Sequence, residues 1–279
     1  MIAGRRDYSR ASWPVPGRRP RALTRRLGSR GKGIHSGSDT WAEGKIMRYL
    51  GGKSRQARRI AEVINPYVKG KIFIEPFVGG FNIIPHIKGA REHFAGDIHS
   101  ALISMYNALK RGWVPPSIVT EEEHKAALSL PDTDPRKAFI RFGCSWGGNF
   151  TSGYARDSQG TNFAAQTRRN LRKRLPAIKA TTFRCCPYAA WPITEDAVFY
   201  CDPPYQRTTG YATGDFDHDA FWAWVRDASE TALVFVSEIT APDDFVSIWR
   251  YDTTRGLRSK KSRKFVDQLF VHRPMLERL

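Results

Sequence analysis

The segment from Lys71 to Gly80 reads KIFIEPFVGG, a short apolar run that ends at a glutamate and opens into a pair of glycines. An apolar run of this length, bounded by proline and glycine, is typical of a buried strand. Glycines directly after a strand allow a tight turn and a close approach of the backbone to a ligand. The segment lacks the GxGxxG spacing of dinucleotide sites, so it predicts a strand and a ligand-binding turn of another kind.

Strands and helices alternate in the pattern around this segment. Helices are expected at 54–65 and 221–228, and strands at 93–97, 197–201 and 232–237. The helix after the second strand has an apolar stripe made of Ile98, Leu102, Met105, Tyr106 and Leu109. The alternation predicts an α/β fold with a doubly wound, mostly parallel sheet.

Three acidic residues stand at the ends of predicted strands. Glu75 ends the first strand, Asp97 ends the second, and Asp202 follows the strand at 197–201. Ligands of open α/β sheets lie at the carboxyl ends of the strands. We therefore expect these three side chains to converge on one crevice.

The tetrapeptide from Asp202 to Tyr205, DPPY, suits methyl transfer to an aromatic amine. Its two prolines fix φ and stiffen the turn. The Asp202 carboxylate and the Pro203 carbonyl can accept hydrogen bonds from the two N–H groups of the amine. These hydrogen bonds make the amine nitrogen more nucleophilic. The Tyr205 ring can replace the stacking that a flipped base loses. A chance Pro-Pro turn beside an acid is the alternative explanation.

Two further features suit an adenosyl ligand. Asp97 stands about twenty residues after the glycine turn, where a carboxylate can bind ribose hydroxyls, although it can also cap the next helix. The segment from Tyr49 to Lys53 reads YLGGK, and a glycine pair before a helix can hold an anionic group beside a lysine. An ordinary solvated lysine is the alternative for Lys53.

Composition divides the chain into three regions. Residues 1–46 hold 11 Lys or Arg and 3 acids without a sustained apolar period, and we expect a disordered basic leader. This leader is either an artefact of start-site choice or expression, or a DNA-binding arm. Residues 114–192 are aromatic, glycine-rich and basic, and predict an inserted, largely helical module. Residues 47–113 and 193–279 then form the main domain.

Charge and cysteine usage favour an intracellular protein with a polyanionic partner. The net charge of +18 points to nucleic acid, although a basic surface without a binding role is the alternative. The four cysteines lack the paired CxxC spacing of a zinc site, so no metal is expected. The chain also lacks an apolar stretch long enough to span a membrane and a secretory signal, which predicts a soluble protein.

These motifs, in this order, resemble the adenine-specific DNA methyltransferases of the Dam type, the D12 class, and further segments resemble several phage-encoded relatives. The resemblance spans about 47–272 and includes CSWGG at 144–148, GYAR at 153–156, SE at 237–238, APDDF at 241–245 and LFVH at 269–272. It implies a Rossmann-like, S-adenosylmethionine-dependent enzyme that methylates the N6 amino group of adenine in double-stranded DNA. The insertion would be the target-recognition region.

Carried over position by position, the resemblance implies two sets of site residues. Cofactor-binding positions are Tyr49, Lys53, Glu75, Phe77, Gly79, Asp97 and Asp202, and catalytic positions are Asp202, Pro203, Pro204 and Tyr205. Phe81 departs from the pattern, because similar chains usually have a third glycine there. Its ring is expected to narrow the methionine end of the pocket.

Two basic clusters are the expected phosphate contacts, although solvated basic faces are common. They comprise Arg168, Arg169, Arg172 and Lys173 in the insertion, and Lys260 and Lys261 near the C-terminus. We expect a monomer in the cytoplasm of a bacterial or phage-infected cell, associated with restriction-modification. The alternatives are a DNA cytosine-N4 methyltransferase and a catalytically silent DNA-binding relative, which Phe81 alone supports.

Overall fold

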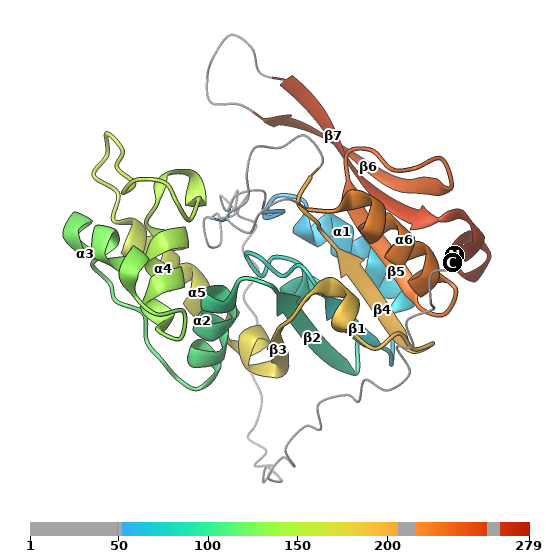
Figure 1. Cartoon of the computed structure of the whole chain (residues 1–279), viewed down its shortest axis with the longest axis horizontal. Helices are drawn as coiled ribbons and strands as arrows, with labels where there is room; N and C mark the ends of the chain where they lie inside the picture. Colours follow the sequence, from blue (N-terminus) through green and yellow to red (C-terminus); the bar gives the residue numbers. More distant parts are fainter. Residues whose placement is uncertain (1–48, 50–51, 206–215, 256–262) are drawn as a thin grey trace, which may run out of the picture.

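The computed structural model describes residues 49, 52–205, 216–255 and 263–279 (Figure 1). Its centre is a seven-stranded sheet with the order β3-β2-β1-β4-β5-β7-β6. The strands are β1 (Ile72–Glu75), β2 (Glu92–Asp97), β3 (Thr181–Cys185), β4 (Ala197–Cys201), β5 (Leu233–Glu238), β6 (Phe245–Arg255) and β7 (Arg263–His272). Strands β1 to β5 pair in parallel, whereas β7 is antiparallel to β5 and β6.

The two faces of the sheet bury two separate hydrophobic clusters. In β1, Phe73 packs into the cluster that contains α1 and α2, whereas Ile72 and Ile74 pack into the cluster that contains α6. These helices are α1 (Ala57–Ile64), α2 (Ser100–Lys110) and α6 (His218–Ser229). Alternate residues of a strand point to opposite faces, so a strand covered on both sides must be apolar throughout. The predicted doubly wound, mostly parallel fold is confirmed.

Helix starts differ from the sequence expectation by a few residues. The helix expected from Ser54 begins at Ala57, after a turn. The helix expected at Ile98 begins at Ser100, with His99 as its N-cap. Ile98 therefore does not join the buried stripe with Leu102 and Met105, and its side chain is 54% exposed at the end of β2.

Residues 114–192 hold three α-helices and one strand. The helices are α3 (Glu121–Ala126), α4 (Pro135–Gly143) and α5 (Phe163–Ala180). Figure 1 shows α3 and α4 at one end of the molecule, with β6 and β7 toward the other. Strand β3 falls inside the range expected for the insertion, yet it pairs with β2 as the edge of the main sheet. The helical part of the insertion thus ends at Ala180.

Short 3-10 helices complete the secondary structure of the described residues. They are η1 (Asn65–Tyr67), η2 (Ile84–His86), η3 (Ala127–Ser129), η4 (Trp146–Gly148), η5 (Tyr188–Ala190) and η6 (Arg273–Arg278). Within the described ranges, no helix combines the length and apolar character needed to cross a membrane.

Candidate active site

The three predicted acidic residues meet at the carboxyl edge of the sheet. Strands β1 and β4 are neighbours, and the chain continues from them in opposite directions, to β2 and to β5. Such a switch in strand order leaves a crevice beyond the strand ends. Glu75 ends β1, Asp97 ends β2, and Asp202 follows β4, so the predicted convergence agrees with the topology.

The glycine turn after β1 is tied to Asp97. The Gly79 amide donates to Asp97 Oδ2 at 3.1 Å, and the His99 amide donates to Oδ1 at 3.0 Å. Gly79 has φ +41°, and a Cβ there would lie 2.8 Å from Cε1 of Tyr49. Burial raises the pKa of Asp97 to about 6. Tyr49, Gly79 and Asp97, all predicted cofactor-binding residues, thus form one wall.

Glu75 lies deeper in the same crevice. Its side chain is buried, and Oε2 has no hydrogen-bond partner among the described residues. Burial, and then the negative charge of Asp202, raise the pKa of Glu75 well above its usual value. An unpartnered acceptor in a buried site is costly unless a ligand or a proton satisfies it. Glu75 therefore offers a site for a donor group of a ligand.

Lys53 is the buried cation of the site. Its side chain is 2% exposed, and its ammonium lies 2.7 Å from Asp202 Oδ1. The same ammonium donates to the Tyr205 hydroxyl and lies 4.2 Å from the centre of that ring. Residues predicted from separate motifs are thus in direct contact. Lys53, expected beside an anionic ligand group, instead has Asp202 and Tyr205 as its protein partners.

Tyr205 differs from the expected open stacking surface. Its side chain is only 5% exposed, and its hydroxyl donates to Asp267 Oδ1 at 3.1 Å. Gln56 Nε2 donates to Asp267 Oδ2 at 2.7 Å. Sequence reasoning missed Gln56 and Asp267. The available signal was the single acid inside the apolar run FVDQLFVH at 265–272.

Phe81 does not narrow the crevice, so that expectation is wrong. Its ring is fully buried and packs against Tyr106 and Phe183, with ring centres 5.6 Å apart in each pair. Its backbone nevertheless has φ +55°, in the left-handed region that favours glycine. The backbone of Phe81 thus keeps a glycine-like conformation, while its side chain points into the core.

Phe77 lies outside the polar wall of the site. Its side chain is half-buried, and its ring stacks on Tyr188 with a centre distance of 5.5 Å. It also contacts Phe221 of α6 edge to face at 5.7 Å. Phe77 therefore connects the glycine turn to the aromatic cluster that covers the other face of the sheet.

Only some of the basic residues predicted to contact phosphates are exposed in the described part of the chain. On α5, Arg169, Arg172 and Lys173 are exposed, whereas Arg168 is half-buried. The neighbouring Arg174 is half-buried and donates to the Phe81 carbonyl at 2.8 Å, so it supports the glycine turn. Lys260 and Lys261 lie outside the described residues.

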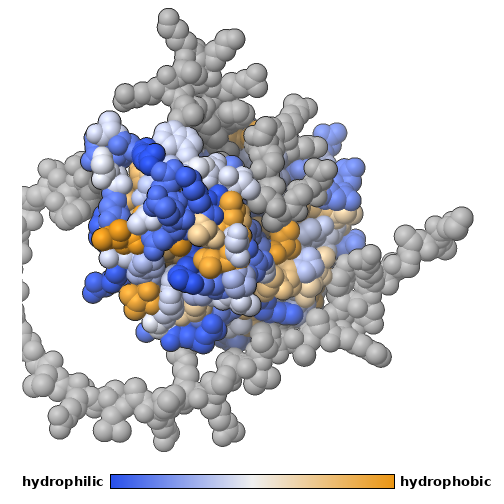
Figure 2. Space-filling model, turned by 60° about the vertical axis from the view of Figure 1, so that its left-hand side comes forward, coloured by the Kyte–Doolittle hydropathy of each residue, from blue (hydrophilic) through white to orange (hydrophobic). Residues whose placement is uncertain are grey.

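A buried arginine holds the loop that follows α4. Arg141 is 2% exposed, and it donates to the carbonyls of His124, Phe150 and Ser152 at 3.2, 2.8 and 2.9 Å. The loop presents the Trp146 side chain, which is 51% exposed. Figure 2 brings this end of the molecule forward and shows a mostly hydrophilic surface interrupted by several separate hydrophobic patches.

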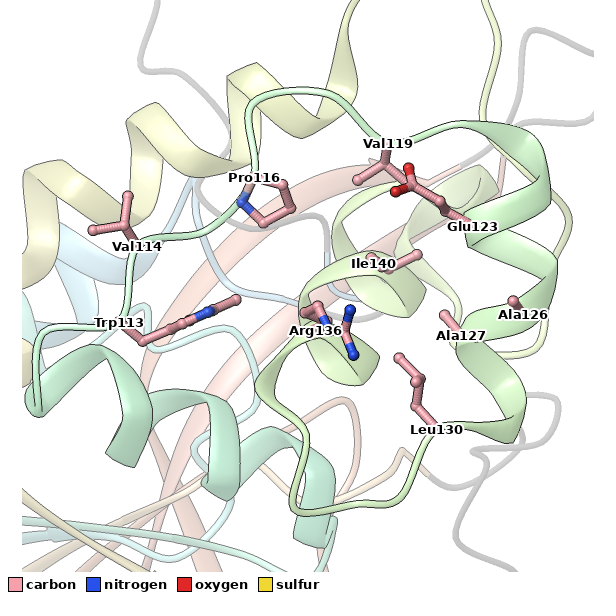
Figure 3. Close-up of a pocket in the computed structure, with 10 residues that line it drawn as sticks. All are labelled: Trp113, Val114, Pro116, Val119, Glu123, Ala126, Ala127, Leu130, Arg136 and Ile140. Carbon is pink, nitrogen blue, oxygen red and sulfur yellow. The ribbon is translucent and has the colours of Figure 1, made fainter.

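A pocket of about 440 Å³ lies in the insertion, apart from the strand ends (Figure 3). The loop after α2, α3 and α4 supply its mainly apolar wall, which includes Trp113, Val119 and Ile140. Its charged residues have partners within the insertion, since Glu123 caps α3 and Arg136 pairs with Asp134. None of the predicted site residues lines this pocket.

Comparison with protein families identifies the chain. The model of the D12 class N6 adenine-specific DNA methyltransferases matches residues 49–143 and 144–223. The chain belongs to this family. It is an S-adenosylmethionine-dependent DNA methyltransferase that acts on the N6 amino group of adenine. The predicted function, donor and fold are thereby confirmed, whereas the roles of individual site residues stay predictions.

Similar solved structures include other methyltransferases. A putative methyltransferase, yhhF, from Escherichia coli has 10% identity and a TM-score of 0.37, with 78% of this chain and 84% of that chain covered. A putative RNA methyltransferase from Pyrococcus horikoshii has 10% identity and a TM-score of 0.36, with 77% and 80% covered. A putative methyltransferase from Streptococcus mutans in complex with SAH has 9% identity and a TM-score of 0.34, with 77% and 97% covered. A comparison with curated protein sequences finds no match.

The described residues contain no cluster of three or more His, Cys, Asp or Glu side chains that could hold a metal ion.

Proposed function

We propose that this D12-class enzyme holds S-adenosylmethionine at the carboxyl ends of β1, β2 and β4. Asp97 would bind the ribose hydroxyls, and the exposed Ile98 beside it offers an apolar surface for the purine ring. The unpartnered Glu75 oxygen and Asp202 would face the methionine end, where S-adenosylmethionine carries its α-ammonium group. Gly79 and Tyr49 would form the wall between these two ends.

The adenine amine would be activated by two acceptors after β4. The donor supplies an electrophilic methyl carbon bound to a sulfonium. Asp202 accepts a hydrogen bond from one N–H of the amine, and the Pro203 carbonyl accepts one from the other. The nitrogen lone pair is then less delocalised into the ring and can attack the methyl carbon. As the N–C bond forms, the S–C bond breaks with its electrons going to sulfur. The surplus proton on nitrogen leaves toward Asp202.

Lys53 orients Asp202 in this scheme. Its ammonium contacts Oδ1 of Asp202 at 2.7 Å, which would hold the carboxylate in one orientation beside the ligand. Held in this way, Asp202 would accept a hydrogen bond from the amine and then take the proton that the amine loses. This ion pair of the buried Lys53 with the partly exposed Asp202, at the strand end beside Glu75, is the observation that carries the assignment of the site. Tyr205 would contribute stacking only after its ring is uncovered.

Double-stranded DNA would bind across the insertion side of the crevice. The exposed Arg169, Arg172 and Lys173 on α5 would supply phosphate contacts, and the exposed Trp146 would supply an aromatic contact from the loop after α4. On the sequence resemblance, we further propose a phage or prophage origin and a link to restriction-modification. A monomer in the cytoplasm is the working assembly.

The test compares wild type, Asp202→Ala and Asp196→Ala on unmethylated DNA with labelled S-adenosylmethionine, followed by nucleoside analysis. Asp196 is the matched control, because it pairs with Arg91 at the opposite edge of the sheet. N6-methyladenine from wild type and the control, but not from Asp202→Ala, would support the assignment. Methylcytosine would favour the cytosine-N4 alternative. DNA binding without any product would favour the silent relative.

A further inference from the structure

The basic helix α5 holds an arginine whose contact lies outside the insertion. Arg172 and Lys173 are exposed, whereas the next residue, Arg174, is half-buried. Its Nη1 donates to the carbonyl of Phe81 at 2.8 Å, across 93 residues of sequence. The three residues form one basic run in the sequence, but this contact separates Arg174 from its two neighbours.

The carbonyl that Arg174 contacts belongs to the glycine turn after β1. Phe81 has φ +55° in this turn, a conformation that persists only where the surrounding structure holds it. The Gly79 amide donates to Asp97 at 3.1 Å, and the Gly79 carbonyl accepts from the Tyr106 hydroxyl at 2.7 Å. The turn is therefore held from β2, from α2 and, through Arg174, from α5.

Arg174 also interacts electrostatically with Glu75, the buried carboxyl at the end of β1. Burial, Asp202 and Asp97 raise the pKa of Glu75, whereas the backbone of Ile84 and Arg174 lower it. Burial lowers the pKa of Arg174 itself to about 10, so its guanidinium stays protonated at neutral pH. The charge of Arg174 thus acts at the strand ends as well as on the turn.

We propose that Arg174 is a positioning residue of the donor site, which holds the glycine turn from the insertion, and is not a phosphate contact like Arg172 and Lys173. The inference rests on the proposed donor site, in which Gly79 forms part of the wall. Arg174 does not touch the ligand in this scheme. It acts through the backbone of Phe81.

The effect of Arg174 on donor binding follows from the strain of the turn. Without the guanidinium, the buried Phe81 carbonyl lacks this donor, and the turn relaxes in part of the unliganded molecules. Only molecules with the intact turn bind S-adenosylmethionine, so the apparent affinity falls in proportion to their fraction. Once the donor is bound the turn has re-formed, and the transfer step itself is unchanged.

The experiment measures steady-state kinetics, with the donor and duplex DNA varied separately, in wild type, Arg174→Gln, Arg174→Lys and Lys179→Gln. Arg174→Gln should raise the KM for S-adenosylmethionine about tenfold, which corresponds to about 1.4 kcal/mol, with kcat and the KM for DNA unchanged. Arg174→Lys should recover most of this loss, because its ammonium can donate to the same carbonyl. Lys179 is exposed on the same helix, so Lys179→Gln is the matched control and should change neither KM.

Two results for Arg174→Gln would overturn the inference. A higher KM for DNA with an unchanged donor KM would make Arg174 a phosphate contact. A lower kcat with both KM values raised would show a general structural role.

A second variant keeps the proposal testable if Arg174→Gln does not fold, as judged by circular dichroism. Arg174→Met keeps an unbranched stem in the half-buried position and removes the charged donor, so the same rise in donor KM is expected. An unchanged donor KM in this variant would overturn the inference. Wild type that binds the donor and forms N6-methyladenine would then still support the proposed function, whereas wild type that binds no donor would refute the donor site itself.

Discussion

At the scale of single residues, Phe81 shows two opposing effects at one position. Its positive φ costs about 1–2 kcal/mol for a residue with a side chain. Its buried ring, packed against Tyr106 and Phe183, contributes more, because removing a buried phenylalanine costs about 3–5 kcal/mol. The packing of the ring outweighs the strain of the backbone, which explains how a turn that favours glycine tolerates phenylalanine.

A matched pair of variants separates these two effects. Phe81→Ala and Phe81→Gly both remove the ring, but only the glycine relieves the strained φ. We expect both variants to lower the free energy of unfolding in urea, with Phe81→Gly about 1 kcal/mol more stable than Phe81→Ala. At a buried position in an ordinary helix or strand, the glycine variant would be less stable than the alanine variant. Equal stabilities would show that the turn relaxes without the ring.

Asp97, the proposed ribose ligand, should make donor binding depend on pH. Its pKa of about 6 lies above the ordinary aspartate value because the group is buried. The unliganded protein therefore holds a proton on Asp97 below about pH 6, and this proton must leave before the carboxylate can accept two ribose hydroxyls. Affinity for S-adenosylmethionine should rise several-fold from pH 5 to pH 7 and then level off.

Calorimetry between pH 5 and pH 8 on wild type and Asp97→Asn checks this dependence. The amide does not titrate, so the part of the pH dependence due to Asp97 should disappear in the variant. Glu75, whose pKa is also raised, remains in both proteins and contributes equally to both profiles. Identical profiles would assign the pH dependence to Glu75 rather than to Asp97.

At the scale of elements, one arginine fixes the loop between α4 and α5. Arg141 donates to three carbonyls from a buried position, so Arg141→Met would leave acceptors unsatisfied at about 1–3 kcal/mol for each buried group. We expect the variant to weaken DNA binding through the loop that carries Trp146, while affinity for S-adenosylmethionine changes little. Fluorescence anisotropy with duplex DNA and calorimetry with the donor measure the two effects.

Trp146→Ala is the control for that prediction. The tryptophan is half-exposed, so its loss should weaken DNA binding with little change in the unfolding midpoint. If Arg141→Met lowers stability but leaves DNA affinity intact, the loop has no role in binding. If it lowers the affinities for donor and DNA together, the insertion and the strand-end site unfold as one unit.

Local sequence predicted the elements that are buried on both faces. Strands β1, β4 and β5 are continuous apolar runs, and their carboxyl ends gave Glu75 and Asp202. Strand β3 has alternating burial at the sheet edge, so its pattern is weak. Asp267 escaped prediction because its partners Gln56 and Tyr205 are 211 and 62 residues away in sequence. Such contacts depend on the assembled sheet and not on any local period.

At the scale of the whole molecule, the positive charge is divided between residues 1–46 and the rest of the chain. Residues 1–46 carry 11 basic and 3 acidic residues, so their removal lowers the net charge from +18 to +10. The sheet, both core clusters and the strand-end site are formed by residues from 49 onward. The remaining +10 is still enough to favour DNA, and the exposed Arg169, Arg172 and Lys173 of α5 contribute to it.

The salt dependence of DNA binding distinguishes specific phosphate contacts from this general charge. Each phosphate contact contributes about 0.9 to the slope of log affinity against log salt concentration. The triple variant Arg169→Ala, Arg172→Ala and Lys173→Ala should therefore reduce the slope by about 3, with equal weakening on all sequences. Lys69 is an exposed lysine near the amino end of β1, and Lys69→Ala should change neither the slope nor the affinity for DNA. A chain that begins at Met47 should keep nearly the wild-type slope; a larger loss there than in the triple variant would make residues 1–46 the main DNA-binding segment.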